Sequence, residues 1–153
     1  EWLPNNLPTE KKTSIVHGDY SLTNVMIGKD DPNVIAILDW ELSTLGDPCA
    51  DFNYHCLQYT MNPKLADKNY CRSKGIPIIE DYVQMYSEKI EIDLTEEWDL
   101  YSAYNLFKLA GILQGILGRV RDGTAANQNA AERASGVKNL SDTAWDLVQK
   151  NFL

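Results

Sequence analysis

The sequence predicts an α+β domain that is mostly helical. Three short apolar runs bounded by turn-forming residues lie between residues 14 and 38 and indicate strands. From about residue 48 onwards, apolar residues recur at the three- and four-residue spacing of helices. Strands and helices do not alternate, which argues against a parallel sheet with crossover helices. At 153 residues, the chain is expected to form a single domain, 1–153.

The three expected strands follow one another closely and cover residues 14–17, 24–27 and 34–38. The polar segment 28–33 (GKDDPN) separates the last two strands and has the composition of a turn, which predicts a β-hairpin. Every residue of 34–38 is apolar, a pattern typical of a strand that is covered on both faces.

The helical patterns come after the strands. They cover approximately residues 48–59, 78–90, 95–121 and 141–152. Asp47 can cap the first of these helices, with Pro48 at its first position. Residues 61–75 are polar and predict a loop. Residues 122–138 are rich in Ala, Asn and Gly, which fits either a short helix or a mobile loop.

The bulk composition argues against some partners and locations. The formal net charge is −8, which disfavours nucleic acids and anionic membranes because phosphates require Lys and Arg. The three cysteines have neither framework nor Cys-x-x-Cys spacing and are interpreted as reduced thiols. The first residues lack the basic start and apolar core of a signal peptide, so we expect a cytoplasmic protein. The chain lacks an initiator Met, which is compatible with a fragment.

Three polar residues at the ends of the expected strands are candidates for chemistry. Asp19 and Asn24 are five residues apart across a sharp loop, which can aim both side chains at one point. Asp39 follows the third strand and can join them. One carboxylate can accept a proton while an amide and a second carboxylate bind Mg²⁺, which prefers oxygen ligands. Phosphoryl transfer requires this division of labour, although capping of turns by the same residues is the alternative.

Two motifs resemble a known family. The segment 17–24 (HGDYSLTN) resembles the catalytic loop His-x-Asp-x-x-x-x-Asn of the protein-kinase-like superfamily, in the form found in aminoglycoside phosphotransferases and choline kinases. The segment 38–51 (LDWELSTLGDPCAD) is similar to the metal-binding segment of that branch. It looks especially like the phosphotransferase-type domain found alone in bacteria or fused to acyl-CoA dehydrogenases, which the segment 106–115 also resembles.

The resemblance implies an ATP- and Mg²⁺-dependent phosphotransferase that acts on the hydroxyl of a small molecule. Asp19 would be the catalytic base. Asn24 and Asp39 would bind the Mg²⁺ that accompanies ATP. His17 would brace the catalytic loop, and Asp51 would hold the backbone of that loop. The motifs do not identify the acceptor.

The resemblance covers only the C-terminal lobe of a protein-kinase-like fold, with a small β-hairpin that carries the catalytic and metal loops. The 14 residues before Ile15 include no Gly-x-Gly-x-x-Gly loop and no Val-Ala-Ile-Lys-like strand. We therefore expect a missing N-terminal lobe or another chain to cover the strand face, and this chain to be inactive alone. The alternative is a non-catalytic pseudo-kinase or interaction module attached to a metabolic enzyme.

Overall fold

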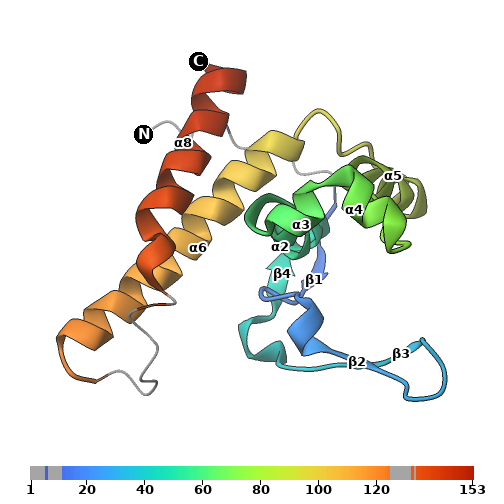
Figure 1. The fold of residues 1–153 in the computed structure, drawn as a ribbon, viewed down its shortest axis with the longest axis horizontal. Helices are drawn as coiled ribbons and strands as arrows, with labels where there is room; N and C mark the ends of the chain where they lie inside the picture. The colour runs from blue at the N-terminus through green and yellow to red at the C-terminus, as the bar shows by residue number, and fades with distance from the viewer. Residues whose placement is uncertain (1–5, 7–11, 125–131, 133) are drawn as a thin grey trace. The chain divides into compact units, whose positions relative to one another are not determined.

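The computed structural model of the protein describes residues 6, 12–124, 132 and 134–153 (Figure 1). The chain divides into two compact units, Glu1–Trp98 and Asp99–Leu153. The first unit carries the strands and the helices α2 to α5, and the second carries most of α6 together with α8. The expectation that the 153 residues form a single domain stays a prediction.

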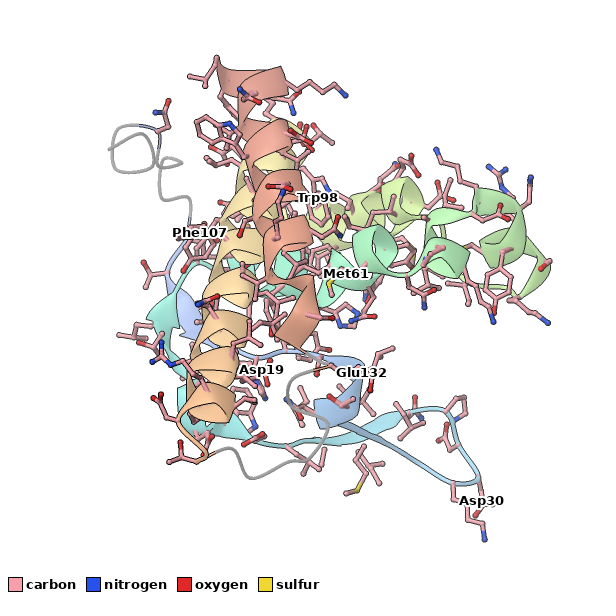
Figure 2. All side chains as sticks on the ribbon, turned by 60° about the vertical axis from the view of Figure 1, so that its left-hand side comes forward. Asp19, Asp30, Met61, Trp98, Phe107 and Glu132 are labelled. Atoms are coloured by element: carbon pink, nitrogen blue, oxygen red, sulfur yellow. The ribbon has the colours of Figure 1, made fainter. Side chains whose placement is uncertain are left out.

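The strands of the described residues form two small sheets. They are β1 (Ser14–Val16), β2 (Val25–Ile27), β3 (Val34–Ile37) and β4 (Thr44–Gly46). β1 pairs antiparallel with β4, and β2 pairs antiparallel with β3. The second pair confirms the predicted hairpin, whose turn is closed by a 3.0 Å hydrogen bond from the Gly28 amide to the Asn33 carbonyl. Asp30 lies at the tip of this hairpin (Figure 2).

The apolar strand β3 is less covered than its sequence predicts. Val34 is 54% exposed and Ile35 is 63% exposed, so the expectation of a strand covered on both faces is wrong for the described residues. The physical reason is that β3 belongs to a sheet of only two strands, while α2 packs on β1 of the other sheet. In β1 and β4, the cross-strand neighbours Ile15 and Leu45 are also largely exposed.

The helices of the first unit follow β4 in the chain. They are α2 (Pro48–Met61), α3 (Pro63–Ala66), α4 (Lys68–Ser73) and α5 (Ile79–Ile90), and the 3₁₀ turns η1 (Leu22–Asn24) and η2 (Trp40–Leu42) precede them. The predicted cap of α2 is confirmed, because Asp47 Oδ1 accepts a 2.8 Å hydrogen bond from the Cys49 amide. The predicted loop at 61–75 is wrong. Asn62 and Asp67 cap α3 and α4, which are too short to create a periodic apolar pattern.

Aromatic residues and thiols fill the core of the first unit. The ring of Phe52 on α2 stacks on that of Tyr86 on α5, with centroids 3.8 Å apart. Cys49, Cys56 and Cys71 are buried and are not joined in a disulfide. This packing fixes α2 against α5 and so provides a rigid support for the residues that α2 presents to the loop after β1.

The second unit consists mainly of two helices. They are α6 (Trp98–Arg121) and α8 (Val137–Phe152), with the 3₁₀ turn η3 (Ala134–Gly136) before α8. Both helices confirm the predicted patterns at 95–121 and 141–152. The amide of Asn151 donates a 2.9 Å hydrogen bond to Asp99 and so links the two helices. Of the segment 122–138, for which the sequence left a short helix and a loop open, residues 125–131 and 133 lie outside the described residues. In the described part of the chain, no helix has the length and apolar character needed to cross a membrane.

Candidate active site

The predicted catalytic loop connects β1 to η1 and is anchored by His17. This side chain is only 3% exposed. Its Nδ1 atom accepts a 3.2 Å hydrogen bond from the Asp19 amide, and its Nε2 atom lies 2.7 Å from the carbonyl oxygen of Leu38. A carbonyl oxygen can only accept, so the proton of the neutral ring lies on Nε2. The imidazole therefore connects the loop to the residue that precedes Asp39.

Gly18 allows a close approach between the loop and η2. Its φ of +82° lies in the left-handed region that favours glycine. A Cβ atom at this position would lie 2.5 Å from the carbonyl oxygen of Leu42. The glycine of the His-Gly-Asp motif is therefore required by backbone conformation and by space.

Asp51 on α2 holds the backbone of the same loop. Its Oδ2 atom accepts a 2.6 Å hydrogen bond from the His17 amide, and its Oδ1 atom accepts a 3.0 Å bond from the Gly18 amide. One carboxylate thus satisfies two consecutive amides directly before Asp19. Hydrogen bonds to a charged acceptor are stronger than neutral ones, so this contact fixes the loop on the helix.

The structure brings Asp19 and Asn24 together. The Asn24 Nδ2 atom donates hydrogen bonds to the Asp19 main-chain oxygen, at 2.9 Å, and to its carboxylate atom Oδ2, at 3.3 Å. Both side chains are half-buried. Because the NH₂ group of the amide points at Asp19, its oxygen Oδ1 points the other way and is available to a cation. Figure 2 marks Asp19, which lies on the segment before η1.

A residue that the sequence did not single out also contacts Asp19. Tyr54, on α2, lies close enough to Asp19 for that side chain to affect its pKa. Burial, a hydrogen bond with the Asp19 side chain and the negative charges of Asp19 and Asp51 raise the pKa of Tyr54 to about 12. The hydroxyl is therefore protonated at neutral pH and acts as the donor. The three-residue spacing from Asp51 places both side chains on one helix face, which is the only sequence signal for this contact.

Asp39 occupies an unusual backbone conformation at the end of β3. Its φ of 66° and ψ of 53° are left-handed, which is costly for a residue other than glycine. Its carboxylate is exposed and does not cap the 3₁₀ turn that follows. The amide of the preceding Leu38 donates a 2.8 Å hydrogen bond to the Asn24 carbonyl. Backbone bonds thus connect the end of β3 to the loop, and strained residues of this kind are common at functional sites.

The available donors suit Mg²⁺ better than a transition metal. Among the described residues, no group of three or more His, Cys, Asp and Glu side chains could hold a metal ion. Mg²⁺ is usually bound by only one or two protein groups together with substrate phosphates and water. The outward amide oxygen of Asn24 and the exposed carboxylate of Asp39 match this hard-oxygen donor set.

The fold and the site together define a protein of the kinase-like phosphotransferase class. The model of the phosphotransferase enzyme family matches residues 1–104. The chain therefore belongs to the phosphotransferase enzyme family. It also resembles a solved structure from Ralstonia eutropha JMP134, described as a "putative aminoglycoside phosphotransferase", with a TM-score of 0.89 and 39% identity. That similarity covers 99% of this chain and 48% of the other, and it confirms the expected kinase-like fold.

Two curated relatives contain a similar segment within much longer chains. Acyl-CoA dehydrogenase family member 10 of Mus musculus is 37% identical over 155 residues, which are 98% of this chain and 14% of that protein. Acyl-CoA dehydrogenase family member 11 of Homo sapiens is 32% identical over 157 residues, which are 99% of this chain and 20% of that protein. The chain thus spans a fifth or less of the length of these relatives, as the sequence resemblance implied.

Proposed function

We propose that this chain is the C-terminal lobe of an ATP- and Mg²⁺-dependent phosphotransferase that acts on a hydroxyl group of a small molecule. The observation that carries the proposal is the contact between Asp19 and Asn24 in a loop whose backbone is held by Asp51. A catalytic carboxylate must be kept in a productive position, and this loop supplies that rigidity.

Asp19 is the proposed base in the transfer. The acceptor hydroxyl donates its proton to the Asp19 carboxylate as its oxygen forms a bond to the γ-phosphorus of ATP. The bond between that phosphorus and the bridging oxygen breaks, and ADP leaves with the electron pair. Asp19 orients the hydroxyl for in-line attack and carries the proton away after transfer.

Asn24 and Asp39 are the proposed ligands of Mg²⁺. The metal, when bound, supplies positive charge that neutralises the phosphates of ATP. Asn24 presents its amide oxygen while its NH₂ group stays on Asp19, so a single residue connects the metal site to the base. His17 maintains this relation by bonding both the Asp19 amide and the Leu38 carbonyl.

We propose further that another lobe or chain covers the exposed strand face and that this chain alone does not turn over ATP. Ile15, Ile35 and Leu45 are large apolar side chains on strands of the two sheets, and each is more than 60% exposed. The sequence contains neither a Gly-x-Gly-x-x-Gly loop nor a Val-Ala-Ile-Lys-like strand to hold the phosphates. Measurable ATP turnover by the 153-residue chain would contradict the proposed inactivity.

The first prediction concerns the two carboxylates of the site. In the product of the complete gene, Asp19→Asn and Asp39→Asn should each lower kcat for phosphoryl transfer at least 100-fold, because each removes a charge that acts in the transition state. The measurement is ADP release across a panel of small alcohols, together with thermal unfolding to verify the fold. Asp30→Asn at the hairpin tip is the matched control and should leave kcat unchanged. Near-normal turnover in either site variant would reject the assignment.

A second candidate is a non-catalytic module attached to a metabolic enzyme. It is favoured by the small share that this segment occupies in its acyl-CoA dehydrogenase relatives. The same assay separates the candidates. A complete gene product that folds but releases no ADP with any acceptor, whether or not Asp19 is substituted, would favour the module.

A further inference from the structure

Two aromatic side chains hold the last two backbone carbonyl groups before Asp39. The indole Nε1–H group of Trp40 donates a 2.8 Å hydrogen bond to the Ile37 carbonyl. The Nε2–H group of His17 donates to the next carbonyl, that of Leu38, at 2.7 Å. The two rings also pack on each other, with centroids 4.9 Å apart and planes inclined by 46°. A pair of packed rings therefore holds the segment that leads into the proposed metal ligand.

The strand pairing satisfies neither of these carbonyl groups. The Leu38 amide donates to the Asn24 carbonyl at 2.8 Å. Successive residues of a strand direct their backbone groups to opposite edges, so the Ile37 carbonyl points away from β2. In the described part of the chain, the sheet has only β2 and β3, and this edge has no partner strand. The Asn24 amide donates to the Ser21 carbonyl at 3.0 Å and so leaves the Leu38 carbonyl to the imidazole.

The backbone of Asp39 needs this support because it is left-handed. Its φ of 66° and ψ of 53° are less stable than extended or right-handed angles for a residue other than glycine. The His17 bond fixes the peptide group on one side of this residue only. The bond from the Trp40 ring to Ile37 closes a loop of backbone that includes Asp39. The indole N–H group is therefore the donor that opposes a return of Asp39 to ordinary angles.

We propose that Trp40 is a positioning residue whose indole N–H group keeps the Asp39 carboxylate in place for Mg²⁺. This inference rests on the proposed function. Trp40 acts only through the backbone of its neighbour, since rotation about φ or ψ of Asp39 changes the direction of the carboxylate relative to Asn24. A ligand that is held in its binding geometry binds a metal ion more tightly than one that must first be ordered.

The substitution Trp40→Phe separates the hydrogen bond from the ring packing. Phe keeps an aromatic ring beside His17 and removes the indole N–H group. In the complete gene product, the Mg²⁺ concentration that gives half-maximal ADP release should rise about fivefold or more, which is the size of effect expected from one hydrogen bond. The KM for the acceptor should stay within twofold of wild type, and excess Mg²⁺ should restore most of kcat. A general structural defect would instead lower kcat at every Mg²⁺ concentration.

Trp145→Phe is the matched control. Trp145 lies on α8 and is 50% exposed, close to the 45% of Trp40. This variant should keep the half-maximal Mg²⁺ concentration within twofold of wild type, and thermal unfolding verifies that both variants are folded. A Trp40→Phe variant with an unchanged Mg²⁺ requirement, or with a loss of kcat that excess Mg²⁺ does not relieve, would overturn the proposal.

An NMR measurement on the 153-residue chain tests the backbone contact without metal or activity. A positive φ brings the amide proton and Hα of one residue close together, so the NOE between these protons of Asp39 should be strong in wild type and in Trp145→Phe. It should weaken in Trp40→Phe, and an NOE of unchanged strength there would overturn the inference. If the NOE weakens but the wild-type gene product shows no Mg²⁺-dependent transfer, the proposed function fails, and with it the role toward the metal, while the backbone contact stands.

Discussion

Single residues in the loop after β1 carry several constraints at once. His17 uses both ring nitrogens in hydrogen bonds, and its neighbour Gly18 takes a left-handed conformation against Leu42. The sequence motif predicted that these residues belong to one loop. It did not predict that the carbonyl of Leu42 leaves no space for a side chain, because that neighbour is 24 positions away and is brought there only by the pairing of β1 with β4.

Replacement of Gly18 by Ala should be strongly destabilising. The left-handed conformation alone costs Ala about 1–2 kcal/mol, and the new Cβ would also collide with the Leu42 carbonyl oxygen, 2.5 Å away. We expect a loss of more than about 2 kcal/mol in the free energy of unfolding, measured with urea. Gly75→Ala is the control, since Gly75 has a φ of +67° but no neighbour within 4 Å. Equal losses in the two variants would show that the collision is relieved at little cost.

At the scale of elements, α2 is the helix that organises the candidate site. Asp47 caps it, and Asp51 holds the loop backbone. The cap was predictable because capping depends on residues adjacent in sequence. The contacts of Asp51 with the loop depend on how the helix packs, so the sequence indicated them only by resemblance.

Removal of the cap tests how firmly α2 is anchored. Asp47→Ala leaves the Cys49 amide without its 2.8 Å acceptor and should lower the free energy of unfolding by about 1 kcal/mol. The same measurement on Asp67→Ala, which uncaps the six-residue helix α4, provides a comparison with a cap away from the loop. We expect kcat of the complete gene product to fall in the first variant and to be unchanged in the second. An uncapped α2 with unaltered stability would argue that packing on α5 alone holds the helix.

At the scale of the whole molecule, the strands expose apolar side chains that a complete core would bury. The uninterrupted apolar run 34–38 predicted covered faces for β3, because such a run is typical of a strand that is buried on both sides. The structure instead places this strand in a two-stranded sheet with Ile35 63% exposed. The apolar pattern is therefore consistent with the proposed cover from another lobe or chain.

The substitution Ile35→Lys distinguishes an exposed strand face from a covered one. In the 153-residue chain it should change the free energy of unfolding by no more than about 0.5 kcal/mol, as expected for a surface position. Val83→Lys, at a position on α5 that is 5% exposed, should by contrast prevent folding or cost several kcal/mol. In the complete gene product, Ile35→Lys should become clearly destabilising if the face is covered there. Neutrality in both proteins would remove the support for a cover over β3.

The sequence by itself determined the mostly helical fold, the hairpin and the identity of the loop residues, since each depends on short-range patterns or on a motif of fixed spacing. The tertiary structure decided β4 and the exposure of β3. Both depend on pairing and packing between segments distant in the chain, which leave no periodic or local signal.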